Sequence, residues 1–275
     1  KPSPKIGFRY FIEIIEFKNK TKTKDTKINA KYIESLLSKL TSESIYVGKF
    51  EVTNQLYHHF IGETGQLNHA SKNLNWAGNI KYPFRLIRNY SNHEDYFNYP
   101  VVNISRESAI EFCKWLTIKY NSFEKKKLGN ITFQLPTEKQ WENFAKVNLI
   151  NSSLFSKRKY LRNSKGVFLC NYNPVEERWI LDSDKDFLKP GLTKEQIREA
   201  GKLDGFEFTC PVDSYFKNEY ELYCIYGNVS EMVLNKPISK GGSWASFRNE
   251  IIVKSDEKFF TPNPFTGFRF IAVEN

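Results

Sequence analysis

The stretch from residue 151 to the C-terminus most strongly constrains the fold, because it lacks the apolar periodicity of long helices or long strands. Turn-forming sequences (NPVE, KPG, LDG, GG and TPNP) alternate there with short aromatic runs. The whole chain is 40% apolar and 16% aromatic, which excludes intrinsic disorder. More than a third of the 275 residues must therefore form ordered irregular backbone, whose peptide groups need internal hydrogen-bond partners.

Regular elements are expected mainly in the first half. Apolar residues at positions 33, 36, 37 and 40 predict a short amphipathic helix over 32–40, and residues 45–52 are typical of extended chain. Thr53 is expected to cap a helix that begins near Asn54. Residues 62–100 show no clear period, and we expect them to form a long packed loop.

Two further helices are predicted together with their caps. Ser105 is expected to open a helix whose apolar residues over 109–118 form one stripe. Residues 132–135 predict a short strand that ends before a proline, and Thr137 then begins a capping box that Gln140 completes. The inward-facing residues of this second helix are expected to be Trp141, Phe144 and Ala145.

Hydropathy argues against a membrane-spanning protein, and the net charge indicates which kinds of partner the chain could bind. No apolar run approaches the roughly 18 residues that are needed to cross a bilayer. The formal net charge of +10 suits an acidic partner, an anionic surface or nucleic acid. Nucleic acid is the weakest of these, because the basic residues are spread along the chain without a recognition helix or RNA-binding motif. The chain begins at Lys1, so we expect a processed or trimmed piece from which any export signal or lipid-anchored cysteine has been removed.

The cysteines and histidines do not predict a zinc or redox motif. The cysteines are 57, 40 and 14 residues apart without a CxxC pair, which leaves one or two disulfides and four buried thiols as open alternatives. The histidines fall within 36 residues, but their spacing places no two of them on one helix face as metal ligands. These residues are Cys113, Cys170, Cys210, Cys224, His58, His59, His69 and His93.

An internal repeat links the two ends of the chain. Residues 1–14 (KPSPKIGFRYFIEI) align without gaps with residues 261–274 (TPNPFTGFRFIAVE). We favour a division in which 1–17 is a tail strand of a preceding homologous module, 18–44 a charged linker with a short helix, and 45–275 one domain. The alternative is that both repeated strands belong to one domain and lie side by side.

Seven motifs occur in order along the chain. They are YVGKFEVTNQLYHHF (46–60), YPVVNISRESAIEFCKWL (99–116), FQLPTEKQWENFA (133–145), DGFEFTCPVDSY (204–215), LYCIYGNVSEMV (222–233), KGGSWAS (240–246) and GFRF (267–270). This set resembles the formylglycine-generating enzyme family, also called the sulfatase-modifying factor domain, over residues 46–272. The resemblance implies an α+β fold, the formylglycine-generating-enzyme variant of the C-type lectin fold, with a few helices and small twisted sheets in much ordered coil.

For several motif residues we expect a role in the fold rather than in chemistry. The glycine of GNVSE is expected where backbone comes close to another group, and Gly241 and Gly242 where a strand passes beneath a large indole. Arg269 is expected to be a buried ion-pair partner or an anchor for carbonyl groups, because its rigid fork can satisfy several acceptors at once.

The resemblance also indicates what the chain lacks. In the catalytic family pattern, two cysteines that hold copper(I) follow the GGS-aromatic motif, and the matching positions here are Ser246 and Ile251. A hydroxyl and an aliphatic chain are not ligands for this soft ion, and no cysteine follows Cys224. The other catalytic branch of the fold needs a three-histidine iron site, and the histidines here lack its spacing. We therefore expect no copper and no catalysis by either route.

Calcium sites are implied by the same resemblance. The first family site maps onto Asn171, Tyr172, Asp204 and Phe206, an all-oxygen set that suits a hard cation, although side chains that only cap turns are the alternative. The second maps onto Gly227, Val229 and Glu231, but Cys224 stands where the family has Asn or Asp. That second site is therefore in doubt.

The function that we expect is a non-catalytic structural or protein-binding component of an exported cell-envelope assembly, in the periplasm or at the outer membrane. The Lys-, Asn- and Ile-rich composition resembles the gliding-motility and type IX secretion lipoproteins of the Bacteroidota. Its partners would be other envelope proteins with acidic surfaces, and a membrane would be reached only through a lipid anchor or a partner. Two alternatives are a copper-dependent oxidase with relocated thiols, and a lectin-fold ligand-binding protein whose variable face is 244–266.

Overall fold

The computed structural model describes residues 27–40, 44–77, 84–146, 161, 168–173, 206, 208–251 and 256–275. The predicted tail strand over 1–17, the beginning of the predicted linker, and Asp204 lie outside the described residues. The division of the chain at residues 17 and 44 stays a prediction.

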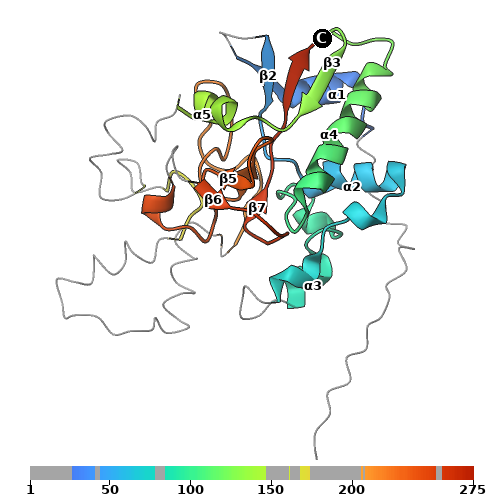
Figure 1. Ribbon diagram of the computed structural model, residues 1–275. Helices are drawn as coiled ribbons and strands as arrows, with labels where there is room; N and C mark the ends of the chain where they lie inside the picture. Colours follow the sequence, from blue (N-terminus) through green and yellow to red (C-terminus); the bar gives the residue numbers. More distant parts are fainter. Residues whose placement is uncertain are drawn as a thin grey trace, which may run out of the picture.

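Two four-stranded sheets form the framework (Figure 1). The first sheet has the order β1-β2-β8-β3 with every neighbouring pair antiparallel, and the second has the order β6-β5-β4-β7 with only the β4–β7 pair parallel. The strands are β1 (Leu37–Lys39), β2 (Ile45–Gly48), β3 (Ile131–Gln134), β4 (Ser230–Met232), β5 (Ile238–Lys240), β6 (Asp256–Lys258), β7 (Thr266–Gly267) and β8 (Ile271–Glu274). Both edges of β8 are paired, so the last strand lies inside the first sheet.

Short polar side chains cap the start of several helices. The described helices are α1 (Ala30–Ser35), α2 (Asn54–Thr64), α3 (Phe84–Asn89), α4 (Arg106–Asn121) and α5 (Glu138–Lys146), with 3₁₀ turns at Leu67–His69, Asn73–Trp76, Glu94–Tyr96 and Arg248–Glu250. The Thr53 hydroxyl accepts from the Leu56 amide, as predicted, and Ser105 caps α4 in the same way. The predicted capping box is also confirmed: the Thr137 amide donates to Gln140 Oε1 at 2.8 Å, and the Gln140 amide donates to Thr137 Oγ1.

The helix predicted over 32–40 is wrong in its extent. Asn29 accepts a hydrogen bond from the Tyr32 amide, so the helix begins at Ala30, and it ends at Ser35. Residues Leu37–Lys39 instead form β1, which pairs with β2. The apolar spacing fits either state over so short a stretch, and the pairing with β2 decides between them.

The long loop predicted over 62–100 is also corrected. This stretch contains the end of α2, three 3₁₀ turns and α3. Each element is a turn or two long, too short to produce a visible helical period. Its aromatic residues nevertheless pack as a loop core, with Trp76 and Tyr90 fully buried at a ring distance of 5.0 Å.

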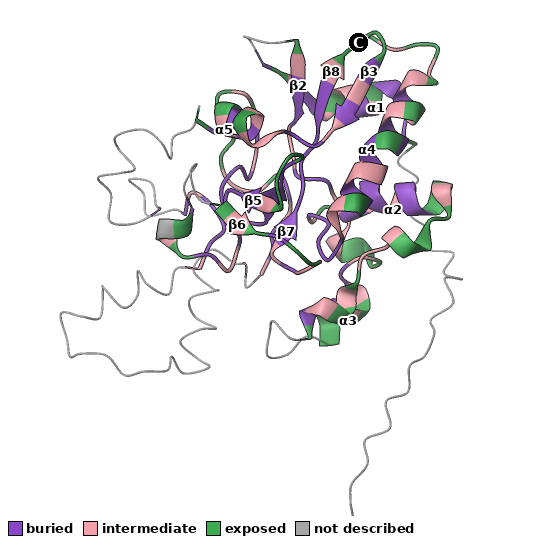
Figure 2. Ribbon diagram, in the orientation of Figure 1, coloured by how far each residue is buried: buried purple, intermediate pink, exposed green. Residues whose placement is uncertain are grey.

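The two faces of the first sheet bury different apolar clusters. Ala272 lies opposite Tyr46 and Phe133, and these residues face the cluster that α2 and α4 cover. Ile271 lies opposite Val47, and this pair faces the second cluster with Trp141 of α5. The first two residues of β8 are buried, and the strand becomes intermediate and then exposed toward its end (Figure 2). The predicted α+β class is confirmed, and none of the helices in the described ranges is long and apolar enough to span a membrane.

Candidate functional site

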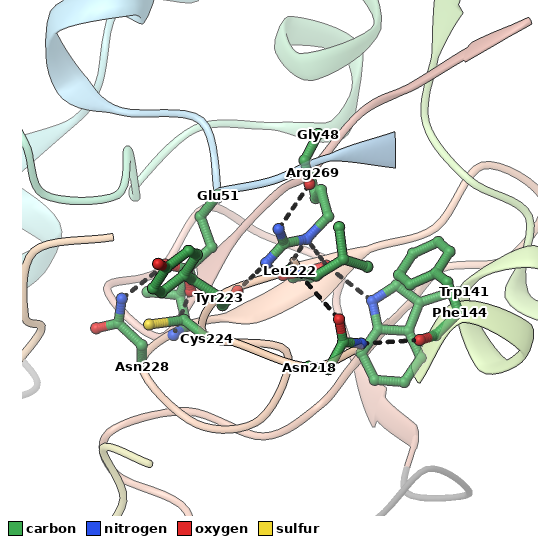
Figure 3. A network of polar contacts seen from close by, with 12 residues as sticks. Gly48, Glu51, Trp141, Phe144, Asn218, Leu222, Tyr223, Cys224, Asn228 and Arg269 are labelled. Carbon is green, nitrogen blue, oxygen red and sulfur yellow. Dashed lines mark hydrogen bonds and ion pairs between the residues drawn. The ribbon is translucent and has the colours of Figure 1, made fainter. Parts of the chain in front are cut away.

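A buried ion pair joins the two sheets, and Figure 3 shows its arginine, Arg269, within a network of polar contacts. Arg269, between β7 and β8, donates from Nη2 to Glu231 Oε1 at 2.7 Å and from Nε to the same carboxylate, which lies on β4. The guanidinium also donates to the carbonyls of Gly48 at 2.8 Å and Tyr223 at 2.7 Å. The predicted role of Arg269 is confirmed in both forms, because it is an ion-pair partner and a carbonyl anchor.

The indole of Trp141 completes the environment of Glu231. Its Nε1–H donates to Glu231 Oε2 at 2.8 Å, so the pair of carboxylate oxygens is held by Arg269 and Trp141. A Cβ on Gly241 would lie 3.0 Å from the same indole and 2.6 Å from the Ile225 carbonyl oxygen. Gly241 therefore passes beneath a large indole, but the indole is that of Trp141 on α5 and not that of the neighbouring Trp244, as the motif had suggested.

Gly227 marks the closest backbone approach near the site. It has φ of 71°, and a Cβ there would lie 2.0 Å from the Asn171 carbonyl oxygen. That carbonyl accepts from the Asn228 amide at 2.7 Å. The expected role of this glycine is confirmed, and the turn 227–228 is fastened to residue 171.

Ser246, one of the two positions matched to the copper cysteines, is built into a hydroxyl network. It is 6% exposed, and its Oγ accepts from the Ser243 amide at 2.9 Å. The same hydroxyl donates to Glu257 Oε1 at 2.9 Å. Burial raises the pKa of Glu257, while hydrogen bonds from Ser246 and Ser230 act in the opposite direction. The network closes the turn that follows the glycine pair.

Ile251, the second matched position, is a core residue. It is 1% exposed and belongs to the same apolar cluster as Trp141. A Cβ on Gly242 would lie 3.0 Å from Ile251 Cγ1 and 3.4 Å from Ser246 Cβ. Both matched side chains therefore border Gly242, and together they offer one hydroxyl and hydrocarbon.

Trp244, the aromatic residue of the KGGSWAS motif, belongs to an aromatic cluster. Its ring lies 6.2 Å from Trp76, 5.3 Å from Phe208 and 5.1 Å from Phe265, measured between centroids. Its Nε1–H donates to the Pro264 carbonyl at 3.1 Å. The aromatic loop core of the 62–100 stretch and the segment after the glycine motif therefore pack on each other.

The cysteines are free thiols, and all of them are buried. This arrangement matches the buried-thiol alternative. Cys210 and Cys224 lie together: their side chains hydrogen-bond, and this contact and burial raise the pKa of Cys224 well above its ordinary value. Cys113 packs in the first apolar cluster and Cys170 in the second. The alternative of a copper-dependent oxidase with relocated thiols needs two cysteines that meet in a cleft. Cys210 and Cys224 do meet, but both are buried, with exposed fractions of 0% and 6%.

The residues of the first expected calcium site are described in part. Asn171 is buried, and its Nδ2 donates to the Phe208 carbonyl at 2.7 Å. Tyr172 is buried beside Asn171, and the Phe206 ring lies 6.4 Å from that of Tyr215. Since Asp204 is outside the described residues, the site stays a prediction. At the second expected site, Glu231 is engaged by Arg269, and the Cys224 thiol donates to a carbonyl, that of Ser214.

The histidines take separate positions in the fold. His69 Nδ1 lies 2.9 Å from Ser108 Oγ, and His93 caps a 3₁₀ turn by accepting from the Asp95 amide. The part of the chain that the structure describes has no group of three His, Cys, Asp or Glu side chains arranged to hold a metal ion.

Sequence reasoning missed the buried carboxylate of Glu51. Its Oε2 accepts from Asn228 Nδ2 at 2.7 Å and its Oε1 from the Val229 amide at 3.2 Å. Burial, with the neighbouring Glu231 carboxylate, raises the pKa of Glu51 well above its ordinary value. The signal that could have identified it is a single acidic residue at a strand end between Phe50 and Val52.

The sequence profile of the sulfatase-modifying factor enzyme 1-like domain matches residues 17–273, which is most of the chain. The chain belongs to this family. Its fold is the formylglycine-generating-enzyme variant of the C-type lectin fold, as the motifs predicted.

Individual relatives are distant. The chain is 25% identical to the formylglycine-generating enzyme of Mus musculus over 231 residues, covering 72% of this chain and 50% of that enzyme. It thus spans about half the length of this relative. PvdO from Pseudomonas aeruginosa superposes with a TM-score of 0.50 at 14% identity, covering 86% of this chain and 89% of that one. Treponema denticola variable protein 1 gives a TM-score of 0.48 at 16% identity, covering 86% and 90%. These similarities to solved structures concern the fold alone.

Proposed function

We propose that this chain is a non-catalytic member of the family and serves as a structural, protein-binding module of an exported cell-envelope assembly. The observation that supports this most is the pair of residues that border Gly242. Ser246 and Ile251 occupy the positions where the catalytic pattern has its copper cysteines. Copper(I) prefers thiolate and thioether ligands, so these two residues do not fit it.

The contacts that Ser246 and Ile251 make inside the fold also support a non-catalytic role. The Ser246 hydroxyl donates to Glu257 and accepts from the Ser243 amide, so its main hydrogen-bonding capacity is used inside the fold. Ile251 fills space in the second apolar cluster. The local structure therefore uses these two positions for packing and for closing a turn.

The Cys210–Cys224 pair is a poor substitute for the missing copper ligands. A cysteine binds metal as the thiolate, and the raised pKa of Cys224 keeps its thiol protonated at neutral pH. Both sulfurs are also buried among Glu51, Asn228 and the adjacent backbone rather than exposed to a peptide substrate. We therefore do not favour the oxidase alternative.

The surface suits contact with another protein. Several large apolar side chains are more than half exposed: Leu67, Leu74, Phe84, Ile118 and Phe260. Aromatic residues, such as the exposed Phe84 and Phe260, are enriched at protein interfaces. The net charge of +10 favours acidic partners. We also propose that the protein is exported and works in gliding motility or type IX secretion, because its composition resembles that of lipoproteins with these roles.

An activity assay tests the non-catalytic part of the proposal. The reduced chain is supplied with copper(I) and oxygen and is mixed with a cysteine peptide that the Mus musculus enzyme converts, and formylglycine is measured by mass spectrometry. We expect conversion by that enzyme and none by this chain. Formylglycine above the copper-only blank would contradict the proposal.

The binding part needs the native setting. Cross-linking in intact cells, followed by purification of this chain and identification of the linked proteins, is expected to give envelope proteins with acidic surfaces. Their recovery without cross-linker should fall as salt rises, because surface charge contacts are screened within about 10 Å at 0.1 M salt. Recovery of the chain alone from both preparations would contradict this part.

A further inference from the structure

One asparagine fixes the backbone of Cys210 close to the segment that carries Cys224. The side-chain amide of Asn228 accepts from the Cys210 amide at 2.8 Å and donates to the Cys210 carbonyl at 3.3 Å. Cys224 lies only four residues before Asn228, in the same run of turns. Figure 3 shows Cys224 and Asn228 on the same side of Arg269. The side chain of Asn228 therefore fixes the backbone of Cys210 beside the run of turns that carries Cys224.

The two side chains make direct contact. The Cys224 thiol hydrogen-bonds with Cys210, and it also donates to the Ser214 carbonyl at 3.5 Å. Asn228 is itself fixed, because Glu51 accepts from its Nδ2 at 2.7 Å. The sulfurs are thus kept together by a hydrogen-bonded framework on both sides. Cys113 lacks this arrangement: it lies on α4 in the first apolar cluster.

We propose that Cys210 and Cys224 are a redox modification site, at which a disulfide forms when the folded protein meets a disulfide oxidant such as oxidised glutathione. The two S–H bonds break and one S–S bond forms, while the disulfide of the oxidant is reduced to two thiols that take up the two protons. The reaction passes through a mixed disulfide between one cysteine and the oxidant, which the second cysteine then displaces.

Burial sets the rate of this exchange. The attacking species is the thiolate, and the raised pKa of Cys224 makes it scarce at neutral pH. Cys224 is 6% exposed and Cys210 is 0% exposed, so Cys224 is the residue that the oxidant reaches first. The reaction requires a local opening of the segment 211–223, and it should be faster at pH 8.5 than at pH 7.

The disulfide would close a loop of about 15 residues in the unfolded chain. Within the folded protein this loop already turns back on itself, because the Asn218 amide donates to the Leu222 carbonyl at 3.0 Å. The oxidised form is therefore expected to melt at a temperature about 5 °C or more above the reduced form.

Peptide mapping of the wild-type chain tests the proposal. The folded protein is incubated with oxidised glutathione at pH 8.5, the remaining thiols are alkylated, and the protein is digested with trypsin without reduction. Cleavage after Lys217 separates the two cysteines, so the expected product is peptide 203–217 joined to peptide 218–240. Two of the four thiols should disappear from the thiol count of the denatured protein.

Two variants test whether the linked peptides and the rise in melting temperature come from the Cys210–Cys224 disulfide. Cys113→Ser should keep the linked peptides and the rise in melting temperature, whereas Cys224→Ser should lose both. Four free thiols after oxidation of the folded protein, or a link that involves Cys113 or Cys170, would overturn the proposal. The result is independent of the activity assay, because a disulfide at this position neither needs nor excludes a catalytic role.

Discussion

Arg269 and Glu231 form an ion pair with an Nη2–Oε1 distance of 2.7 Å, and both side chains are fully buried. The pair joins the segment that leads into β8 of the first sheet to β4 of the second. Removing a charge from water is costly, and here two carbonyls and an indole N–H supplement the ionic contact. Arg269 therefore ties the two sheets to each other through Glu231.

Replacement of Arg269 should destabilise the protein strongly. Arg269→Ala leaves the Glu231 carboxylate buried without its partner, and the expected loss is about 3–5 kcal/mol in the free energy of unfolding, measured with urea. Arg269→Lys should recover only part of this, because an ammonium lacks the fork that reaches Glu231 and two carbonyls. Lys114→Ala, in an exposed pair with Glu111, is the control and should change stability by less than about 0.5 kcal/mol. Equal effects at both positions would refute the anchor role.

Gly227 provides a test of the close turn. In Gly227→Ala the new Cβ would meet the Asn171 carbonyl oxygen at 2.0 Å in a left-handed backbone, so we expect a loss of stability well above about 1 kcal/mol. Gly62→Ala is the matched control, since nothing lies within 4 Å of a Cβ there and the residue is inside α2. That control should stabilise by about 0.5–1 kcal/mol. Thermal unfolding of both variants measures the difference, and a neutral Gly227→Ala would show that the turn can relax.

The sequence predicted these anchors because the chemistry of each residue limits its choices. Only glycine tolerates the approach at residue 227, and only an arginine reaches the acceptors around residue 269. The capping box at Thr137 was equally clear, because its hydrogen bonds are local. The Ser246–Glu257 contact was not visible, since it joins residues 11 apart in the sequence and no local pattern pairs them. The sequence also did not predict that the helix gives way to a strand at Leu37, because this strand is set by its pairing with β2.

Glu257 gives a prediction for the dependence of stability on pH. Burial raises its pKa in the folded protein, so between the ordinary value of 4.5 and the raised value the folded state holds a proton that the unfolded state has lost. The contribution of Glu257 to stability is therefore greatest below pH 4.5 and decreases as the pH rises through this window.

Glu257→Gln removes this titration while an amide oxygen can still accept from Ser246. The fall in melting temperature between pH 4.5 and pH 7 should be smaller in the variant than in the wild type. Glu94→Gln, the same substitution on an exposed 3₁₀ turn, is the matched control. An identical profile for Glu257→Gln and the wild type would contradict the assignment.

Calcium binding at Asn171, Tyr172, Asp204 and Phe206 stays a proposal with a direct test. If the site is formed, calcium should raise the melting temperature of chelator-treated protein, because a ligand that binds only the folded state stabilises it. Asp204→Asn should remove most of this increase, since it takes a charge from the ligand set. Asp95→Asn is the control. A melting temperature that does not respond to calcium would exclude the site.

Copper(I) titration of the reduced protein, against a chromogenic copper(I) chelator, tests the central claim most directly. Ser246 and Ile251 provide no thiolate, so the wild type should take up less than one equivalent, with the same curve for Cys210→Ser. The double variant Ser246→Cys, Ile251→Cys places two thiols beside Gly242 and serves as the positive comparison. Tight uptake of one copper(I) per wild-type chain, lost in Cys210→Ser or Cys224→Ser, would contradict the non-catalytic account and favour an oxidase with relocated thiols.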